Sequence, residues 1–123
     1  MPKTSGPVLV VDDDAAVRQL VVRILEKAGY PVLAASNGPD ALALAEEHEH
    51  PIACLVTDVI MPQMLGSELA RRLNAQRPDT PVLYMSGYAD PMLSDDHTDD
   101  SPTVLAKPFT HRELITALRN TTG

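Results

Sequence analysis

Acidic, hydroxyl and basic side chains close four apolar runs of this sequence, and they are the side chains that could do chemistry together. The acidic triplet Asp12–Asp14 follows one run and Asp58 closes another, while Ser86 and Lys107 follow two more. Carboxylates that meet within a few ångströms repel one another by on the order of a few kcal/mol per pair at an effective dielectric near 20. Such a cluster therefore needs a cation or bound protons.

A divalent cation with oxygen ligands is the expected counter-charge. Hard carboxylate oxygens suit Mg²⁺, which keeps coordination positions open for phosphate oxygens. A nearby lysine adds a point charge that can hold a phosphoryl group, and a serine hydroxyl can donate a further hydrogen bond. The combination predicts a site that binds Mg²⁺ and stabilises a phosphoryl group on a carboxylate.

The apolar runs themselves predict the strands that must position these side chains. They cover residues 8–11, 32–35, 52–56, 82–85 and 103–106. Short continuous apolar runs are typical of strands covered on both faces, as in a parallel sheet. Segments with helical spacing follow the first, second, third and fifth runs, so we expect an α/β fold with an open, doubly wound, five-stranded parallel sheet.

The carboxyl ends of such strands share one edge of the sheet, where sites form in open α/β folds. If the first strand is central and the third lies beside it, the aspartates meet there, with the serine and lysine on neighbouring strands. The helix expected between the fourth and fifth strands has the least support in the sequence. The segment 90–102 holds five aspartates and two prolines but no Lys or Arg. We expect its helix to be weak or irregular: either a solvated acidic loop or a segment that becomes ordered when a phosphoryl group draws in Ser86 and Lys107.

Composition excludes several classes of protein. The chain of 123 residues carries a formal net charge of −7, and its longest apolar run has five residues. We therefore expect one domain over residues 1–123, with a core from about 7 to 121, that is cytoplasmic, binds no nucleic acid directly and does not insert into membranes. The single Cys54 cannot form an internal disulfide and is expected to be buried and inert.

Each polar feature also has a purely structural interpretation. The acidic triplet could serve only as a helix N-cap, Asp58 could be a loop residue and Lys107 a solvated lysine. The joint arrangement at four strand ends favours the functional interpretation. The histidines show no metal-ligand spacing and are expected at the surface; they are His48, His50, His97 and His111.

Four short motifs, in order and at matching spacing, resemble the receiver domain of two-component response regulators. They are Leu9–Asp14, Thr57–Pro62 with Gly66 beyond it, Met85–Gly87 and Lys107–Phe109. The resemblance runs from Val8 to about Asn120 and implies a flavodoxin-like (βα)5 fold. The residues around the last two motifs are similar to receivers fused behind sensor histidine kinases.

The resemblance implies a role for each matching residue. Asp58 would accept a phosphoryl group from a phosphohistidine, and Asp12, Asp13 and Asp58 would bind Mg²⁺ together with the backbone carbonyl of Ile60. Lys107 would pair with the phosphoryl oxygens, with a cis bond to Pro108, and Ser86 would hydrogen-bond the phosphoryl group. Asp14 matches a position that is not a usual ligand.

One position departs from the family pattern, because Val104 stands where an aromatic residue often swings inward on activation. The implied partner is a sensor histidine kinase or a phosphotransfer domain, with the chain acting alone or within a larger hybrid kinase. The expected chemistry is self-catalysed phosphotransfer and autodephosphorylation.

The main alternative is a small aspartate-based, Mg²⁺-dependent phosphohydrolase. Its strand-one motif would end in Thr or Val where this chain has Ala16. A flavodoxin-like binder is disfavoured because three aspartates would repel a phosphate, and a docking-only pseudo-receiver because the acidic, serine and lysine set is complete.

Overall fold

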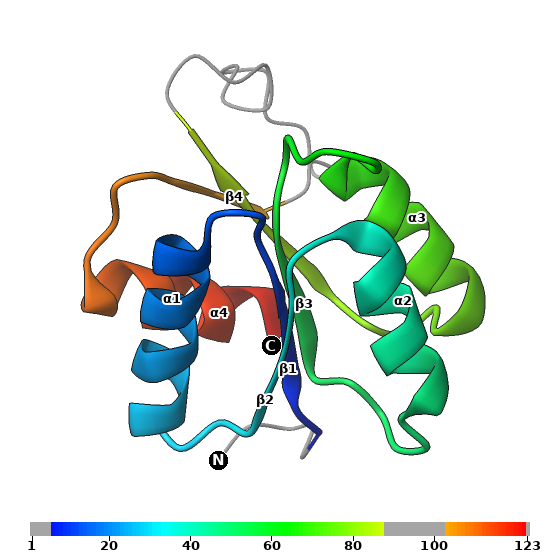
Figure 1. The fold of residues 1–123 in the computed structure, drawn as a ribbon. Helices are drawn as coiled ribbons and strands as arrows, with labels where there is room; N and C mark the ends of the chain where they lie inside the picture. Colours follow the sequence, from blue (N-terminus) through cyan, green and yellow to red (C-terminus); the bar gives the residue numbers. More distant parts are fainter. Residues whose placement is uncertain (1–5, 88–102, 123) are drawn as a thin grey trace.

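Five parallel strands form one sheet, and helices cover both of its faces (Figure 1). The computed structural model describes residues 6–87 and 103–122. The strands are β1 (Val8–Val11), β2 (Val32–Ala35), β3 (Cys54–Asp58), β4 (Val82–Ser86) and β5 (Thr103–Ala106), in the spatial order β2-β1-β3-β4-β5. The helices are α1 (Ala15–Lys27), α2 (Gly38–Glu47), α3 (Gly66–Gln76) and α4 (His111–Thr122). The predicted open, doubly wound parallel sheet is confirmed.

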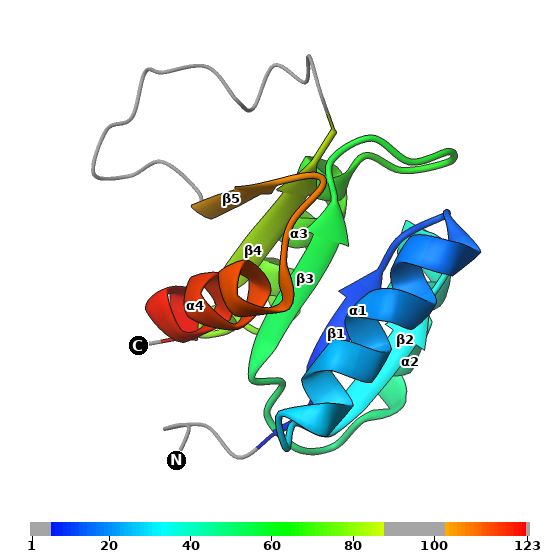
Figure 2. The same ribbon diagram turned by 90° about the vertical axis from the view of Figure 1, so that its left-hand side faces the viewer.

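Each face of the sheet has its own hydrophobic core. On β1, Val8 and Val10 pack beneath α1 and α4, whereas Leu9 and Val11 pack beneath α2 and α3. Figure 2 shows α1 and α4 on the same side of the sheet. All four β1 side chains are fully buried, which explains why this strand is apolar at every position and not at alternate ones.

The third strand begins two residues after the start of its apolar run. The run covers residues 52–56, whereas β3 covers Cys54–Asp58 and ends at Asp58 as predicted; Ile52 is buried just before it. The ladder continues past the apolar run because backbone pairing does not require apolar side chains: Thr57 pairs with Tyr84 and Asp58 with Met85. Asp58 is therefore the last residue of a central strand.

Short local signals set the helix ends. At the start of α4, the Thr110 backbone N donates to Glu113 Oε1 at 2.9 Å, and the Glu113 backbone N donates to Thr110 Oγ1 at 3.1 Å. These two reciprocal hydrogen bonds form a capping box, the Thr-x-x-Glu pattern that starts many helices. After α1, Gly29 has a φ of 97°, a left-handed conformation that glycine adopts without strain and that ends the helix.

Two sequence-based expectations fall partly or wholly outside the described residues. The segment 90–102, with its predicted irregular helix, lies outside them, as does His97. Within residues 6–87 and 103–122, no helix combines the length and apolar character needed to cross a bilayer.

Candidate functional site

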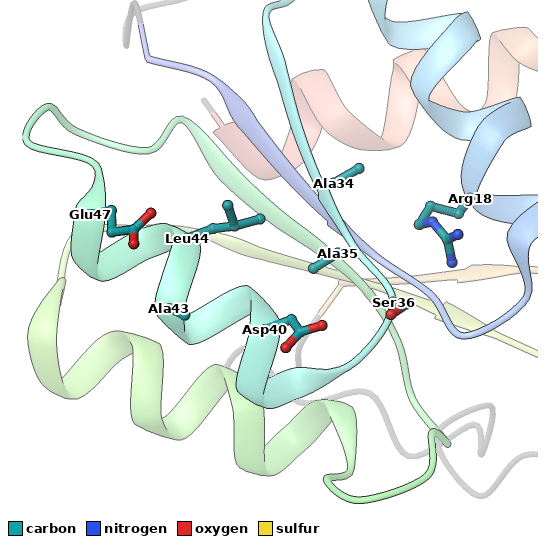
Figure 3. A pocket seen from close by; sticks show the side chains of 8 residues that line it. All are labelled: Arg18, Ala34, Ala35, Ser36, Asp40, Ala43, Leu44 and Glu47. Atoms are coloured by element: carbon teal, nitrogen blue, oxygen red, sulfur yellow. The ribbon is translucent and has the colours of Figure 1, made fainter.

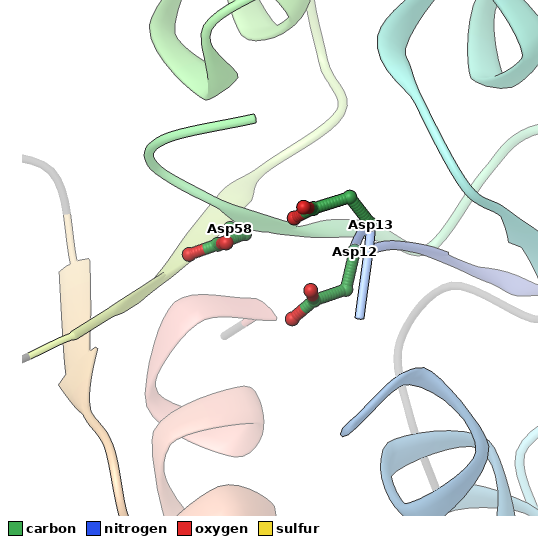
Figure 4. Close-up of side chains that lie close together, drawn as sticks. All are labelled: Asp12, Asp13 and Asp58. Carbon is green, nitrogen blue, oxygen red and sulfur yellow. The ribbon is translucent and has the colours of Figure 1, made fainter. Parts of the chain in front are cut away.

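Three carboxylates converge at the carboxyl edge of the sheet (Figure 4). Asp12 directly follows β1, Asp13 comes next in the chain, and Asp58 ends the neighbouring strand β3. One ligand oxygen from each of the three lies within 4.8 Å of the others. Asp12 is fully buried, the Asp58 side chain is 14% exposed, and Asp13 is exposed. The cluster is therefore buried at Asp12 and open to solvent at Asp13.

A single ammonium group balances part of this charge. Lys107 Nζ lies 3.0 Å from Asp12 Oδ2 and 3.4 Å from Asp58 Oδ1. The Lys107 side chain is 22% exposed, and its backbone N donates to the carbonyl of Ser86 at 2.8 Å, which ties it to the end of β4. The bond from Lys107 to Pro108 is cis, as the sequence resemblance implies. Lys107 thus faces the acids from a strand two places from β3.

The site's electrostatics favour uptake of positive charge. Burial raises the pKa of Asp58, the negative charge of Asp12 raises it further, and Lys107 opposes both effects. Burial lowers the pKa of Lys107, but its hydrogen bond to Asp12 and the charges of both acids outweigh burial and raise it overall. Lys107 is therefore a cation at neutral pH, and one cation faces three carboxylates.

Ser86 lies at the same edge of the sheet. It is the last residue of β4 and directly follows Met85, the register partner of Asp58. Its side chain is buried, and Oγ donates to the Gly87 carbonyl at 3.3 Å. Among the described residues this hydroxyl bonds to its own loop, and a hydroxyl can turn toward a new acceptor at little cost.

The acidic triplet divides between the two interpretations. Asp14 is the N-cap of α1: its Oδ1 accepts from the backbone N of Ala16 at 2.9 Å and of Val17 at 3.3 Å. The capping interpretation is therefore right for Asp14, whereas Asp12 and Asp13 belong to the carboxylate cluster. The Asp14 backbone N donates to Asp12 Oδ1 at 2.9 Å, which joins the cap to the cluster.

The loop after β3 is held tightly against the end of that strand. The Gly66 backbone N donates to the Val59 carbonyl at 2.8 Å, and a side chain at Gly66 would collide with the backbone carbonyl of Asp58. This contact explains the glycine of the second motif. Ile60, whose backbone carbonyl was predicted as a ligand, lies in this loop with a side chain that is 58% exposed.

Two features of the structure were not predicted from the sequence: a contact of Arg18 and the burial of His48. Arg18 Nη1 donates to the backbone carbonyl of Asp12 at 2.7 Å. The clue was its place on the first turn of the helix that follows the acids. His48 was expected at the surface, but it is half-buried because it closes α2 above the loop to β3. Its buried Nε2 has no hydrogen-bond partner among the described residues.

The expectations for the other described histidines and for Cys54 fit the structure. His50 and His111 are exposed, as predicted. Cys54 is fully buried within β3, and burial raises the pKa of its thiol to about 12, so the inert core role is confirmed. Val104 is half-buried and packs against the core beneath α2 and α3.

Comparison with known proteins gives concordant matches. The family model described as "Response regulator receiver domain" matches residues 8–119. The response regulator receiver protein CpdR of Brucella abortus is 40% identical over 111 residues, which are 88% of this chain and 89% of CpdR. The sensor kinase CckA of the same organism is 37% identical over 116 residues, which are 94% of this chain but 12% of that kinase.

Solved structures share the same fold. The receiver domain of the hybrid histidine kinase CckA superposes with a TM-score of 0.81 at 33% identity, covering 96% of this chain and 100% of that one. The Vibrio cholerae chemotaxis protein CheY4 superposes with a TM-score of 0.81 at 31% identity, covering 94% and 98%.

Proposed function

The chain belongs to the response regulator receiver family and is a phosphoacceptor domain of two-component signalling, and on that premise we propose that Asp58 is the residue that takes the phosphoryl group. The observation that supports this choice is the position of Asp58. It ends the central strand β3, lies in the carboxylate cluster and has Lys107 Nζ 3.4 Å from its Oδ1.

Asp58 is better suited to nucleophilic attack than Asp12. Asp12 is fully buried, and its two oxygens accept from the Asp14 backbone N and from Lys107. The Asp58 side chain keeps 14% exposure, so a donor can approach it. In the proposed step an Asp58 oxygen forms the new O–P bond, the N–P bond of the phosphohistidine breaks, and its electron pair stays on the imidazole.

Lys107 and Ser86 are proposed to stabilise the phosphoryl group. The ammonium of Lys107 already lies against Asp58, where it can pair with a phosphoryl oxygen. The Ser86 hydroxyl can exchange its hydrogen bond to the Gly87 carbonyl for one to the phosphoryl group. Ser86 ends the strand next to β3 and Lys107 follows the strand beyond it, so both groups are already close to Asp58 and little reorganisation is needed.

The carboxylate cluster fits Mg²⁺, which receiver domains generally bind at such a site. Asp12, Asp13 and Asp58 offer hard oxygen donors, one of them exposed enough to leave room for water. We assign these residues and the backbone carbonyl of Ile60 as the ligands. When bound, the ion supplies positive charge that offsets the repulsion between the acids and an incoming phosphoryl group.

The family implies a histidine kinase or a phosphotransfer protein as partner. Whether this receiver is a part of a larger hybrid kinase is a separate proposal, which rests on the likeness to CckA. The match also covers 89% of CpdR, a response regulator receiver protein, and the full-length gene decides between a hybrid kinase and a separate receiver. In either case we propose one domain over residues 1–123, with its core from about 7 to 121, in the cytoplasm. None of the relatives compared above supports the phosphohydrolase alternative.

Intact-mass spectrometry tests the acceptor directly. After incubation with acetyl phosphate and Mg²⁺, we expect the mass of one added phosphoryl group on the unaltered chain and no gain for Asp58→Asn. Asp79→Asn is the matched control, because Asp79 is an exposed carboxylate outside the cluster and should leave phosphorylation unchanged. Equal phosphorylation of Asp58→Asn would refute the assignment.

A further inference from the structure

The side chain of Arg18 bends back along α1 toward the acidic loop. Its Nη1 donates to the backbone carbonyl of Asp12 at 2.7 Å, across six positions of the chain. The Arg18 backbone N also donates to the Asp14 carbonyl at 2.9 Å, the first hydrogen bond of the helix. One residue therefore holds the loop between β1 and α1 at two of its carbonyls.

The carbonyl that Arg18 binds belongs to the peptide unit that joins Asp12 to Asp13. Regular pairing of β1 with β2 ends at Val11, opposite Ala35, and the next contact is a longer one of 3.3 Å from the Asp12 backbone N to the Ala35 carbonyl. The peptide after Asp12 thus lies beyond the sheet ladder. Rotation of that peptide would move the Asp13 carboxylate relative to the other two acids.

The guanidinium occupies a partly shielded position. Figure 3 shows Arg18 coming from α1 on one side of β2, while Asp40, Leu44 and Glu47 come from α2 on the other. These residues line a pocket of about 480 Å³ along the edge strand. Arg18 is half-buried there, and a charge-assisted hydrogen bond shielded from water is stronger than an exposed neutral one.

We propose that Arg18 is a positioning residue that holds the Asp12–Asp13 peptide in the orientation needed for Mg²⁺ binding; this inference rests on the proposed function of the cluster. Arg18 touches neither the metal nor the phosphoryl group in this role. It acts through the backbone, as the outer-shell partners of metal ligands do.

The sign of the effect separates positioning from simple electrostatics. Arg18 carries a positive charge near a cation site, so if only its charge mattered, its removal would strengthen Mg²⁺ binding. If its hydrogen bond positions the ligands, its removal weakens binding despite the gain in attraction. The two accounts therefore predict opposite changes in one dissociation constant.

Calorimetric titration with Mg²⁺ alone, without a phosphoryl donor, measures that constant. Arg18→Met keeps the alkyl stem in the pocket and removes the donors, and we expect roughly tenfold weaker binding. Arg18→Lys restores one donor and should recover most of the affinity. Arg23→Met is the matched control: Arg23 is exposed on the same helix, makes no side-chain hydrogen bond within the described residues, and should leave the affinity unchanged.

Unchanged or tighter Mg²⁺ binding by Arg18→Met would overturn the proposal. Urea unfolding checks that the variant is folded, and if it is not, Arg18→Gln, whose amide is too short to reach the carbonyl, takes its place with the same two outcomes. Phosphorylation by acetyl phosphate adds a second readout: the Arg18→Met rate should fall at low Mg²⁺ and recover at saturating Mg²⁺.

Failure of this inference is distinguishable from failure of the proposed function. If the unaltered chain is phosphorylated at Asp58 and Arg18→Met binds Mg²⁺ normally, only the positioning role fails. If the unaltered chain gains no phosphoryl group, the assignment of Asp58 fails. The Mg²⁺ titrations still test the positioning role of Arg18, because they use no phosphoryl donor.

Discussion

Removal of the Lys107 ammonium should destabilise the metal-free protein by an amount that follows from the geometry of the site. Lys107→Met keeps most of the alkyl stem but leaves Asp12 buried without its cation. At an effective dielectric of 20, charges 3.0 and 3.4 Å apart attract by about 5 kcal/mol each. Water screens part of this attraction, because the Lys107 side chain is 22% exposed. We expect a net loss of about 2 to 3 kcal/mol in the free energy of unfolding.

Urea denaturation in EDTA and then in saturating Mg²⁺ tests this expectation. The added cation takes over the charge balance that Lys107 provides, so the stability gap between the variant and the unaltered chain should narrow in Mg²⁺. The variant should also bind Mg²⁺ more tightly, because the competing ammonium is gone. Lys27→Met, at an exposed lysine in the last turn of α1, should change stability by less than about 1 kcal/mol.

Two results would refute this reasoning. Equal stability of Lys107→Met and the unaltered chain in EDTA would mean that the ammonium does not offset the buried charge of Asp12. A gap of the same size in EDTA and in Mg²⁺ would mean that the lysine and the metal do not act on the same carboxylates.

Three further predictions test other contacts. Burial, with help from Asp12 and against Lys107, raises the folded-state pKa of Asp58 above its ordinary value of 3.8. The folded state then holds this proton more tightly than the unfolded chain does. In EDTA, the free energy of unfolding of the unaltered chain, measured relative to that of Asp58→Asn, should therefore fall as the pH rises from 3.8 through the raised pKa. Urea denaturation that gives the same difference between the two proteins at every pH would contradict this. Burial raises the pKa of Cys54 to about 12, so a thiol-specific disulfide reagent should react only as fast as the protein unfolds, and fast reaction in native buffer would refute the burial. Arg77 donates to the backbone carbonyls of Ala45, His48 and His50, so Arg77→Met should cost about 2 kcal/mol in urea denaturation while leaving Mg²⁺ affinity unchanged.

The sheet could be predicted from the sequence because its strands are buried on both faces. That burial makes β1 apolar at all four positions, a pattern that needs no tertiary information to recognise. The strand ends then place Asp12 and Asp58 at one edge, and the observed neighbourhood of β1 and β3 confirms that expectation. The predicted end of β3 at Asp58 is confirmed, whereas its start at Cys54 lies two residues inside the apolar run, because Ile52 and Ala53 are buried without belonging to the strand.

Contacts to backbone groups were not predictable in the same way. The bond from Arg18 to the Asp12 carbonyl and the clash that excludes a side chain at Gly66 both involve main-chain atoms, which every residue possesses. The burial of His48 depends on how the end of α2 meets the loop that follows, and no periodic pattern encodes it. Such features depend on tertiary geometry and not on the types of neighbouring residues.

Chemical mapping of the acyl phosphate is the most direct test of the central claim. Borohydride reduces an aspartyl phosphate to homoserine, so peptide mass spectrometry after phosphorylation and reduction identifies the acceptor by position. The account predicts homoserine at residue 58 only, dependent on Mg²⁺ and lost when EDTA is present before the phosphoryl donor. Homoserine at Asp12 or Asp13, with Asp58 unchanged, would contradict it.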